Sequence, residues 1–245
     1  MSILAKIQQQ SAAPSGKKMF AIVLGQRTSG KTTISGTLPG KTLLLQAAVL
    51  ESGNESAKAL AKQNKNDLVV HSFETLAELR NILTELEQDT AFDNIYVDGL
   101  GALTEMKAAE PAVIAAAKRD VWAAYREIAN DATEFLLKAK ALTYPTKVKK
   151  AKNVFVTAAL DVKTDPNGMP IEVELVAKGR VATSMATKLG EAVLTVVQVQ
   201  GEKGPERKII TRTAGVMPGR VDSLLDAANP GMVEANLTTV LNLVK

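Results

Sequence analysis

The sequence predicts an α/β fold, in which a mostly parallel sheet is flanked by helices and followed by an antiparallel C-terminal hairpin. Short apolar segments of strand length alternate with helix-patterned segments over the first two thirds of the chain. The first apolar segment runs directly into a glycine-containing loop of the kind that binds phosphates. Near the C-terminus, two strand-like segments are separated by Gly201-Glu-Lys-Gly204, which is typical of a hairpin.

Length and composition narrow the class of protein. A chain of 245 residues suits one large domain, and we expect an N-terminal arm over 1–18 and the domain over 19–245. The absence of cysteine excludes disulfides and thiolate metal sites. No apolar run approaches the ~20 residues of a membrane span, and the first ten residues lack a secretory core, so we expect a cytoplasmic location and no membrane partner. The net charge of +4 is mild.

Two interpretations of the N-terminal arm remain open. Residues 2–10 have a helix-forming composition, whereas residues 11–18 are small and polar. The segment is either a frayed tail or a short arm that docks on a neighbouring subunit through a flexible tether. We favour the arm.

A phosphate loop follows the first predicted strand, Ala21–Leu24. The segment 25–32 reads G-x-x-x-x-G-K-T, in which the glycines permit a tight loop whose N–H groups point at phosphates. A predicted helix over Thr33–Leu38 adds its positive end. We expect the nucleotide-binding residues to be Gly25, Gln26, Arg27, Thr28, Ser29, Gly30, Lys31, Thr32 and Thr33.

Two side chains of this loop have distinct expected roles. The Lys31 ammonium would reach the β- and γ-phosphates of a nucleotide, and the Thr32 hydroxyl would ligate Mg²⁺. The strand before the loop and the helix pattern after it are both where the motif requires them. The expected ligands are therefore a nucleoside triphosphate such as ATP and Mg²⁺.

The second predicted strand, Thr42–Leu50, ends at Glu51. Its nearly continuous apolar run is typical of a buried parallel strand, and ligands bind at the carboxyl edge of such sheets. Glu51 could polarise the water that attacks a γ-phosphate. It could equally be an ordinary glutamate at a helix start, because residues 57–65 look helical.

The third and fourth predicted strands are Leu68–Phe73 and Ile95–Val97. The third contains the only histidine, His71, to which we assign no role. Thr75 begins a capping box that opens the helix between the two strands. Asp98 ends the fourth strand, where an acid would hold Mg²⁺ opposite the loop threonine.

Residues 105–141 predict a mostly continuous helix whose main part begins at Pro111. Trp122 and Tyr125 fall on one face of it. They could stack on nucleic-acid bases, but such a pair is more often part of a core, and we prefer the core.

A lysine-rich segment precedes the predicted strand Asn153–Leu160. Between Glu134 and Asp161 six lysines occur with no acid among them, a pattern typical of a solvated surface or of a face toward a polyanion. Residues 161–168 predict a polar loop, residues 172–177 a further strand, residues 191–200 and 207–213 the hairpin, and two short helices the end of the chain. The lysines of that segment are Lys138, Lys140, Lys147, Lys149, Lys150 and Lys152.

The order of these motifs resembles the RecA-like branch of P-loop ATPases. It is most similar to the compact bacteriophage members linked with homologous recombination and single-strand annealing. Four segments carry the resemblance: Gly25–Thr33, the strand ending at Glu51-Ser52-Gly53, Ile95–Asp98, and Arg207–Leu225.

The resemblance implies roles for individual residues. Lys31 and Thr32 would contact phosphate and Mg²⁺, Asp98 would be the second metal-side acid, and Thr157 would sense the γ-phosphate. Asp98 is followed by Gly99 and not by a glutamate. This favours a catalytic base from the earlier strand, namely Glu51.

The resemblance also implies partners and an activity. It implies a homo-oligomeric ring or filament that hydrolyses ATP on single-stranded DNA, in the host cytoplasm if the chain is phage-encoded. The expected DNA contacts are Lys147, Lys149, Lys150, Lys178 and Arg180. The expected candidates for completing a neighbour's ATP site are Lys178, Arg180, Arg212 and Arg220.

Two other functions compete with this one. The first is an ATP-binding switch or structural protein with little turnover that acts on a protein partner. The second is a nucleotide kinase, which we rank last because the late arginines lie in predicted strands and turns and not in a lid.

Overall fold

The computed structural model describes residues 16–48, 54–166, 170–178, 180–202, 204–221 and 230–244. The strands are β1 (Phe20–Gly25), β2 (Lys41–Ala47), β3 (Asp67–Phe73), β4 (Asn94–Asp98), β5 (Asn153–Thr164), β6 (Pro170–Val176), β7 (Ala192–Gly201), β8 (Gly204–Ile210), β9 (Arg220–Val221) and β10 (Met232–Glu234). The helices are η1 (Thr33–Thr37, a 3₁₀ helix), α2 (Asn54–Gln63), α3 (Leu76–Leu86), α4 (Leu100–Ala108), α5 (Pro111–Ala117), α6 (Val121–Ala141), α7 (Arg180–Leu189) and α8 (Leu237–Leu243).

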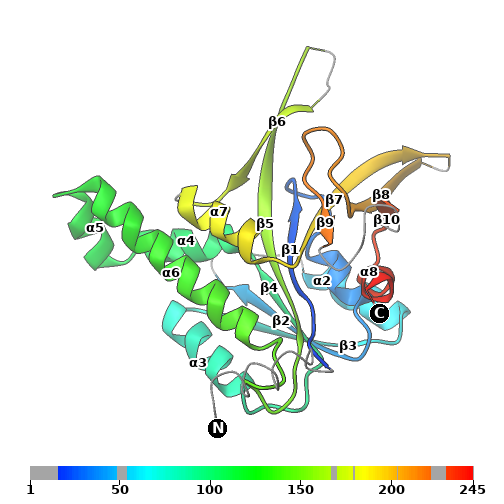
Figure 1. Cartoon of the computed structure of the whole chain (residues 1–245), viewed down its shortest axis with the longest axis horizontal. Helices are drawn as coiled ribbons and strands as arrows, with labels where there is room; N and C mark the ends of the chain where they lie inside the picture. The colour runs from blue at the N-terminus through cyan, green and yellow to red at the C-terminus, as the bar shows by residue number, and fades with distance from the viewer. Residues whose placement is uncertain are drawn as a thin grey trace, which may run out of the picture.

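The strands form one mixed sheet in the order β10-β8-β7-β1-β5-β4-β2-β3. The six strands from β7 to β3 are parallel, whereas β8 and β10 pair antiparallel beyond β7. The predicted α/β class and the antiparallel C-terminal hairpin are therefore confirmed. β6 pairs antiparallel with the distal part of β5, and this hairpin rises above the sheet (Figure 1).

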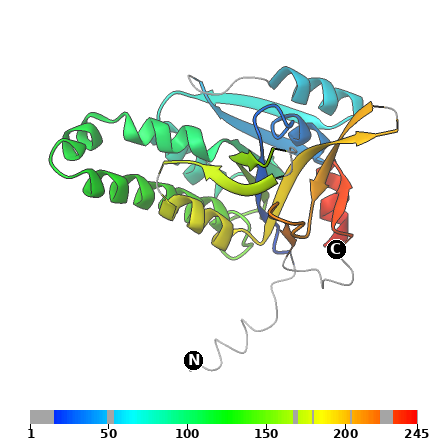
Figure 2. The same ribbon diagram turned by 90° about the horizontal axis from the view of Figure 1, so that it is seen from above.

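Helices cover both faces of the sheet (Figure 2). Ile22 and Leu24 of β1 pack in a core with α3, α4 and α6, whereas Ala21 and Val23 pack in a second core with η1, α2 and α8. A strand buried on both faces needs apolar side chains in both directions. This explains why β1 is a continuous apolar run.

Several predicted element bounds are wrong. β2 ends at Ala47 and not at Leu50, and Leu50 lies outside the described residues. β5 continues to Thr164, so the loop predicted from Asp161 is a strand, because β6 supplies the pairing partner. The helix after the phosphate loop is a single 3₁₀ element over Thr33–Thr37.

The long predicted helix is divided into α4, α5 and α6. Pro111 begins α5 as expected. The helix is interrupted again before α6, where the Asp120 carboxylate accepts a hydrogen bond from the Trp122 N–H at 2.9 Å. α5 and the start of α6 project from the body of the molecule (Figures 1 and 2). Val113, Ala124 and Ile128 form a small core of their own that holds this helical hairpin together.

The last third contains elements that the sequence did not predict. These are α7, β9 and β10. The final helix was predicted to begin after Gly231, but β10 comes first, and α8 begins at Leu237, where the Asn236 side chain caps it by accepting from the Thr238 N–H at 2.9 Å. The other predicted C-terminal helix was given no bounds, and residues 222–229 lie outside the described residues.

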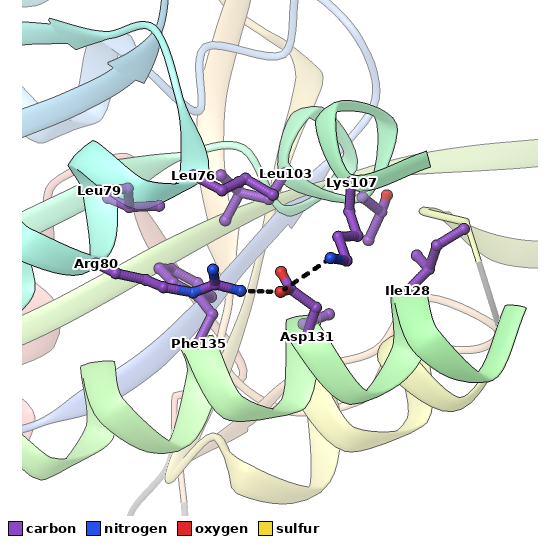
Figure 3. A pocket seen from close by; sticks show the side chains of 10 residues that line it. Leu76, Leu79, Arg80, Leu103, Lys107, Ile128, Asp131 and Phe135 are labelled. Carbon is purple, nitrogen blue, oxygen red and sulfur yellow. Dashed lines mark hydrogen bonds and ion pairs between the residues drawn. The ribbon is translucent and has the colours of Figure 1, made fainter. Parts of the chain in front are cut away.

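A charged cluster joins three helices (Figure 3). Asp131 of α6 pairs with Arg80 of α3 and lies 3.9 Å from the Lys107 ammonium of α4. Burial raises the pKa of the Asp131 carboxyl, although both cations oppose this. The cavity beside the cluster measures about 10 Å³, enough for about one water molecule and too small for a nucleotide.

No helix in the described ranges has both the length and the apolar character needed to cross a bilayer.

Candidate functional site

The phosphate loop leaves the carboxyl end of β1 and turns back through two left-handed residues. Thr28 has φ 65° and Gly30 has φ 96°. The loop closes with a hydrogen bond from the Ser29 N–H to the Gln26 carbonyl at 3.3 Å. Side chains rarely adopt the Gly30 conformation, which accounts for a glycine there.

The Lys31 side chain folds back over the loop. Its ammonium donates to the carbonyls of Gly25 at 2.9 Å and Gln26 at 2.8 Å. The charge therefore lies across the concave side of the loop. A phosphate bound by the loop N–H groups would meet this ammonium directly.

Two hydroxyls converge on one buried carboxylate. The Thr32 hydroxyl donates to Asp98 Oδ2 at 2.5 Å, and the Thr157 hydroxyl donates to Asp98 Oδ1 at 2.6 Å. Asp98 is 3% exposed. The sheet order explains the cluster, because β5 lies between β1 and β4 and brings Thr157 between the loop and the acid.

Tyr96, on the same strand as Asp98, contacts the backbone of the phosphate loop. Its hydroxyl donates to the Lys31 carbonyl at 2.5 Å, and its ring stacks on Phe155 with the centroids 6.0 Å apart. Burial, and secondarily the Asp98 carboxylate, raises the pKa of the Tyr96 hydroxyl well above its usual value. Tyr96 thus remains a proton donor that fixes the backbone at the lysine.

The loop and the cluster open into a hollow of about 910 Å³. Its far wall is the β5–β6 hairpin with the start of α4. Lys178 lines the hollow and pairs with Glu105 at 2.7 Å. Besides Asp98, the lining carboxylates are Glu105, Asp161 and Glu174.

Arg207 of β8 belongs to the site, a role that sequence reasoning missed. A Cβ atom placed on Gly30 would lie 2.7 Å from the Arg207 Nε, so the guanidinium lies against the loop. Arg207 also lines a second hollow of about 380 Å³, which shares Thr33 with the first. The wall of the second hollow is completed by Ile34, Leu60, Gln198, Pro205 and Ala235.

Gln46 is a second residue that the sequence analysis did not single out. It lies on β2 in register with Asp98 and is 1% exposed. Its carbonyl accepts from the Asn54 amide at 3.0 Å, but its Nε2 has no hydrogen-bond partner among the described residues. The Ser29 hydroxyl in the loop has none there either. Buried donors without partners are rare, and these two lie in or beside the predicted site.

The donor set fits magnesium held together with phosphate. Within the described ranges, no cluster of three or more His, Asp or Glu side chains could hold a metal on its own. Mg²⁺ commonly takes one or two protein oxygens and completes its shell with phosphate and water. The Thr32 hydroxyl and the Asp98 carboxylate are oxygens of that kind.

The remaining predicted site residues either lie outside the described residues or have other contacts. Glu51 lies outside the described residues, as does the side chain of Arg180, which begins α7. Arg220 donates to the carbonyls of Thr187 at 2.9 Å and Gly190 at 2.5 Å, so it secures the end of α7.

The lysine segment lies at the opposite edge of the sheet, because it precedes β5, whereas the phosphate loop follows the carboxyl end of β1. Lys147 and Lys149 are exposed there, and Lys150 pairs with Asp93 at 2.7 Å. Lys152 is fully buried and donates to three backbone carbonyls, so it is not part of a solvated face. Burial lowers the pKa of its ammonium.

The preferred core interpretation of the aromatic pair is wrong. Trp122 is 73% exposed and Tyr125 is 45% exposed. Both lie on the projecting start of α6, where the buried face is formed instead by Ala124 and Ile128.

A scan against protein-family models gave no match to this chain, and neither did a search of curated proteins.

Proposed function

We propose that the chain is a P-loop nucleotide-binding protein that binds ATP with Mg²⁺ and hydrolyses it. Within that class we propose a RecA-like ATPase that oligomerises on single-stranded DNA and promotes annealing or recombination. The observation that carries the proposal is the convergence of Thr32 and Thr157 on Asp98 beside the loop. This arrangement agrees with the sensor role that the RecA-like resemblance implies for Thr157.

Each residue has a role in this proposal. The loop N–H groups hold the phosphates, and Lys31 exchanges its two carbonyls for β- and γ-phosphate oxygens. Thr32 and Asp98 would hold Mg²⁺, which when bound neutralises charge on the phosphates. Thr157 keeps the Asp98 carboxylate in one orientation.

The second hollow is suited to the nucleoside. It begins at Thr33, directly after the phosphate loop, and its wall includes the apolar side chains of Ile34 and Leu60. Arg207 lies between the two hollows. A nucleotide would thus place its phosphates over the loop and its base in the smaller hollow.

One observation favours the low-turnover switch as the second candidate. The described end of β2 and the residue after it read Gln46, Ala47 and Ala48, with no carboxylate beside Asp98. Hydrolysis then depends on a base from elsewhere, and Glu51 remains our proposal for it.

ATP turnover measured with and without single-stranded DNA tests the proposal. DNA-stimulated hydrolysis supports the recombination function, whereas binding without turnover supports the switch. The Lys31→Ala variant should lose tight ATP binding in a calorimetric titration, because the charge that faces the phosphates is gone. Its unfolding temperature should fall only slightly, because the substitution also removes the hydrogen bonds from the ammonium to the Gly25 and Gln26 carbonyls. Parental ATP affinity in that variant would contradict the site.

A further inference from the structure

The tip of the α5–α6 hairpin presents an aromatic pair to solvent. The Trp122 and Tyr125 rings lie with their centroids 6.4 Å apart and tilted by 50°. Contiguous exposed apolar patches often mark a site of interaction. Ile114 of α5 and Val121 of α6 are also exposed, at 46% and 52%.

The acids and the cations of the α5–α6 hairpin differ in whether they have ionic partners. Two of its acids, Glu110 and Glu127, pair with the Lys107 ammonium of α4 at 2.5 Å and 3.5 Å, and their side chains are 38% and 44% exposed. Lys118 and Arg119 are exposed. In the described part of the chain these two make no ion pair and no side-chain hydrogen bond.

Arg126 adds a third cation on the same helix as the rings. It is exposed, and its only described acidic partner is Asp120 at a long 3.4 Å, whose other oxygen caps α6. Residues 118–126, which include both rings, therefore carry three cations and one acid, and that acid is already hydrogen-bonded.

We infer that Lys118, Arg119, Trp122, Tyr125 and Arg126, here called the hairpin patch, bind single-stranded nucleic acid by stacking bases on the two rings. Exposed aromatic rings interleaved with cations are the combination that single strands require, since every base has a π-face and every nucleotide a phosphate. The inference rests on the DNA-binding part of the proposed function and adds where the strand lies.

The hairpin is mechanically connected to the nucleotide site. α4 begins two residues after Asp98 and leads into α5. Lys107 on α4 lies 3.9 Å from the Asp131 carboxylate on α6, which ties the two helices together. A strand bound at the patch would thus be held on a platform continuous with the metal-side acid.

The single tryptophan of the chain makes a direct test possible. A dye-labelled oligothymidylate should quench the Trp122 fluorescence saturably, with the midpoint that fluorescence anisotropy gives. Trp122→Ala should weaken binding by about 10- to 100-fold, as expected for a lost stacking partner, and Trp122→Phe should restore most of it. Leu137→Ala, which removes another half-exposed apolar side chain from α6, should leave the affinity unchanged.

The cations are tested by salt dependence. Lys118→Ala with Arg119→Ala should reduce the slope of log affinity against log salt by about 0.7 for each cation removed. Lys62→Ala with Lys188→Ala removes the same charge from other exposed positions and should leave the slope unchanged. All variants should keep the parental unfolding temperature, because the substituted side chains are exposed.

Three results would overturn the inference. In the first, the parent binds the oligonucleotide without any quenching of the Trp122 fluorescence, and Trp122→Ala binds it with the parental affinity. Binding could instead be lost in Lys147→Ala with Lys149→Ala, which would place the strand at the opposite edge of the sheet. Trp122→Ala could lower the mass in sedimentation without changing DNA affinity, which would make the patch a protein contact.

Failure of the proposed function is a separate outcome. If the parent binds ATP but shows no affinity for the oligonucleotide, the DNA-binding part of the proposed function fails, and the inference fails with it. If the parent binds DNA and the substitutions in the hairpin patch leave its DNA affinity unchanged, the proposed function stands and this inference alone is wrong.

Discussion

Arg207 lies against Gly30, so that a strand from the last third of the chain closes over the phosphate loop. The Arg207 Nε is 2.7 Å from the position that a Gly30 Cβ would occupy. No ion pair or side-chain hydrogen bond involving Arg207 occurs among the described residues. A guanidinium held there without a carboxylate is available to phosphate oxygens.

Arg207→Ala should weaken ATP binding by roughly 10- to 100-fold, because a hydrogen bond to a charged group contributes about 1.5–3 kcal/mol. Arg207→Lys should recover part of the loss, since it restores charge but not the planar fork. Isothermal titration with ATP measures both. Lys208→Ala removes a cation that pairs with Glu206 on the same strand, and it serves as the control. Equal affinities for Arg207→Ala and Lys208→Ala would exclude Arg207 from the site.

Thr157→Val should slow hydrolysis while leaving ATP affinity within a few-fold of the parent. The substitution removes the hydroxyl that orients the Asp98 carboxylate and leaves Oδ1 of a buried acid without that donor, a loss of about 1–3 kcal/mol. Thr157→Ser keeps the hydroxyl and should restore turnover. Steady-state kinetics separate kcat from KM. A Thr157→Val enzyme with parental kcat would make the threonine a purely structural residue.

Part of the geometry of the candidate site was predictable because the loop motif is local. The spacing of Gly25, Gly30 and Lys31 can be recognised without knowledge of the tertiary structure. Asp98 was predicted because it ends a short apolar strand. Thr157 was predicted only through the resemblance, and the structure brings it to the Asp98 carboxylate. The nucleotide-binding activity itself remains a prediction.

What the sequence did not predict depends on tertiary packing. The spacing of Trp122 and Tyr125 places them on one helix face but does not say whether anything covers that face. Arg207 reaches the loop only because β7 pairs with β1 and β8 pairs with β7. The end of β2 was overestimated because the apolar run continues beyond the pairing with β4, whose last partner in that register is Gln46.

The catalytic base can be sought by comparing two glutamates. Glu51→Gln should keep ATP affinity and slow hydrolysis by about 10²–10⁴-fold, as expected when a general base is lost. Glu174 of β6 lines the larger hollow beside the phosphate loop, which makes Glu174→Gln the matched comparison. Single-turnover hydrolysis measures both. If only Glu174→Gln slows hydrolysis, the base comes from the β5–β6 hairpin and Glu51 is a helix-start residue.

Asp93 links the lysine segment to stability in acid. It accepts from the Lys150 ammonium at 2.7 Å and from the Lys41 N–H at 3.0 Å. Partial burial alone would raise the pKa of this carboxyl, but the two hydrogen bonds outweigh burial and hold the pKa below its usual 3.8. The stabilisation from the ionised group is complete well above that value and is lost as the pH falls through the lowered folded-state pKa.

Asp93→Asn should therefore lower the free energy of unfolding at neutral pH and flatten its decline as the pH falls below about 5 and through the lowered folded-state pKa, because asparagine cannot be protonated there. Urea unfolding at a series of pH values gives both quantities. Asp67→Asn, at a carboxylate 62% exposed and 3.8 Å from Lys41, is the matched control and should follow the parental curve. If Asp93→Asn loses stability with acid as steeply as the parent does, the acid sensitivity comes from other carboxylates and the ion pair between Asp93 and Lys150 contributes nothing measurable.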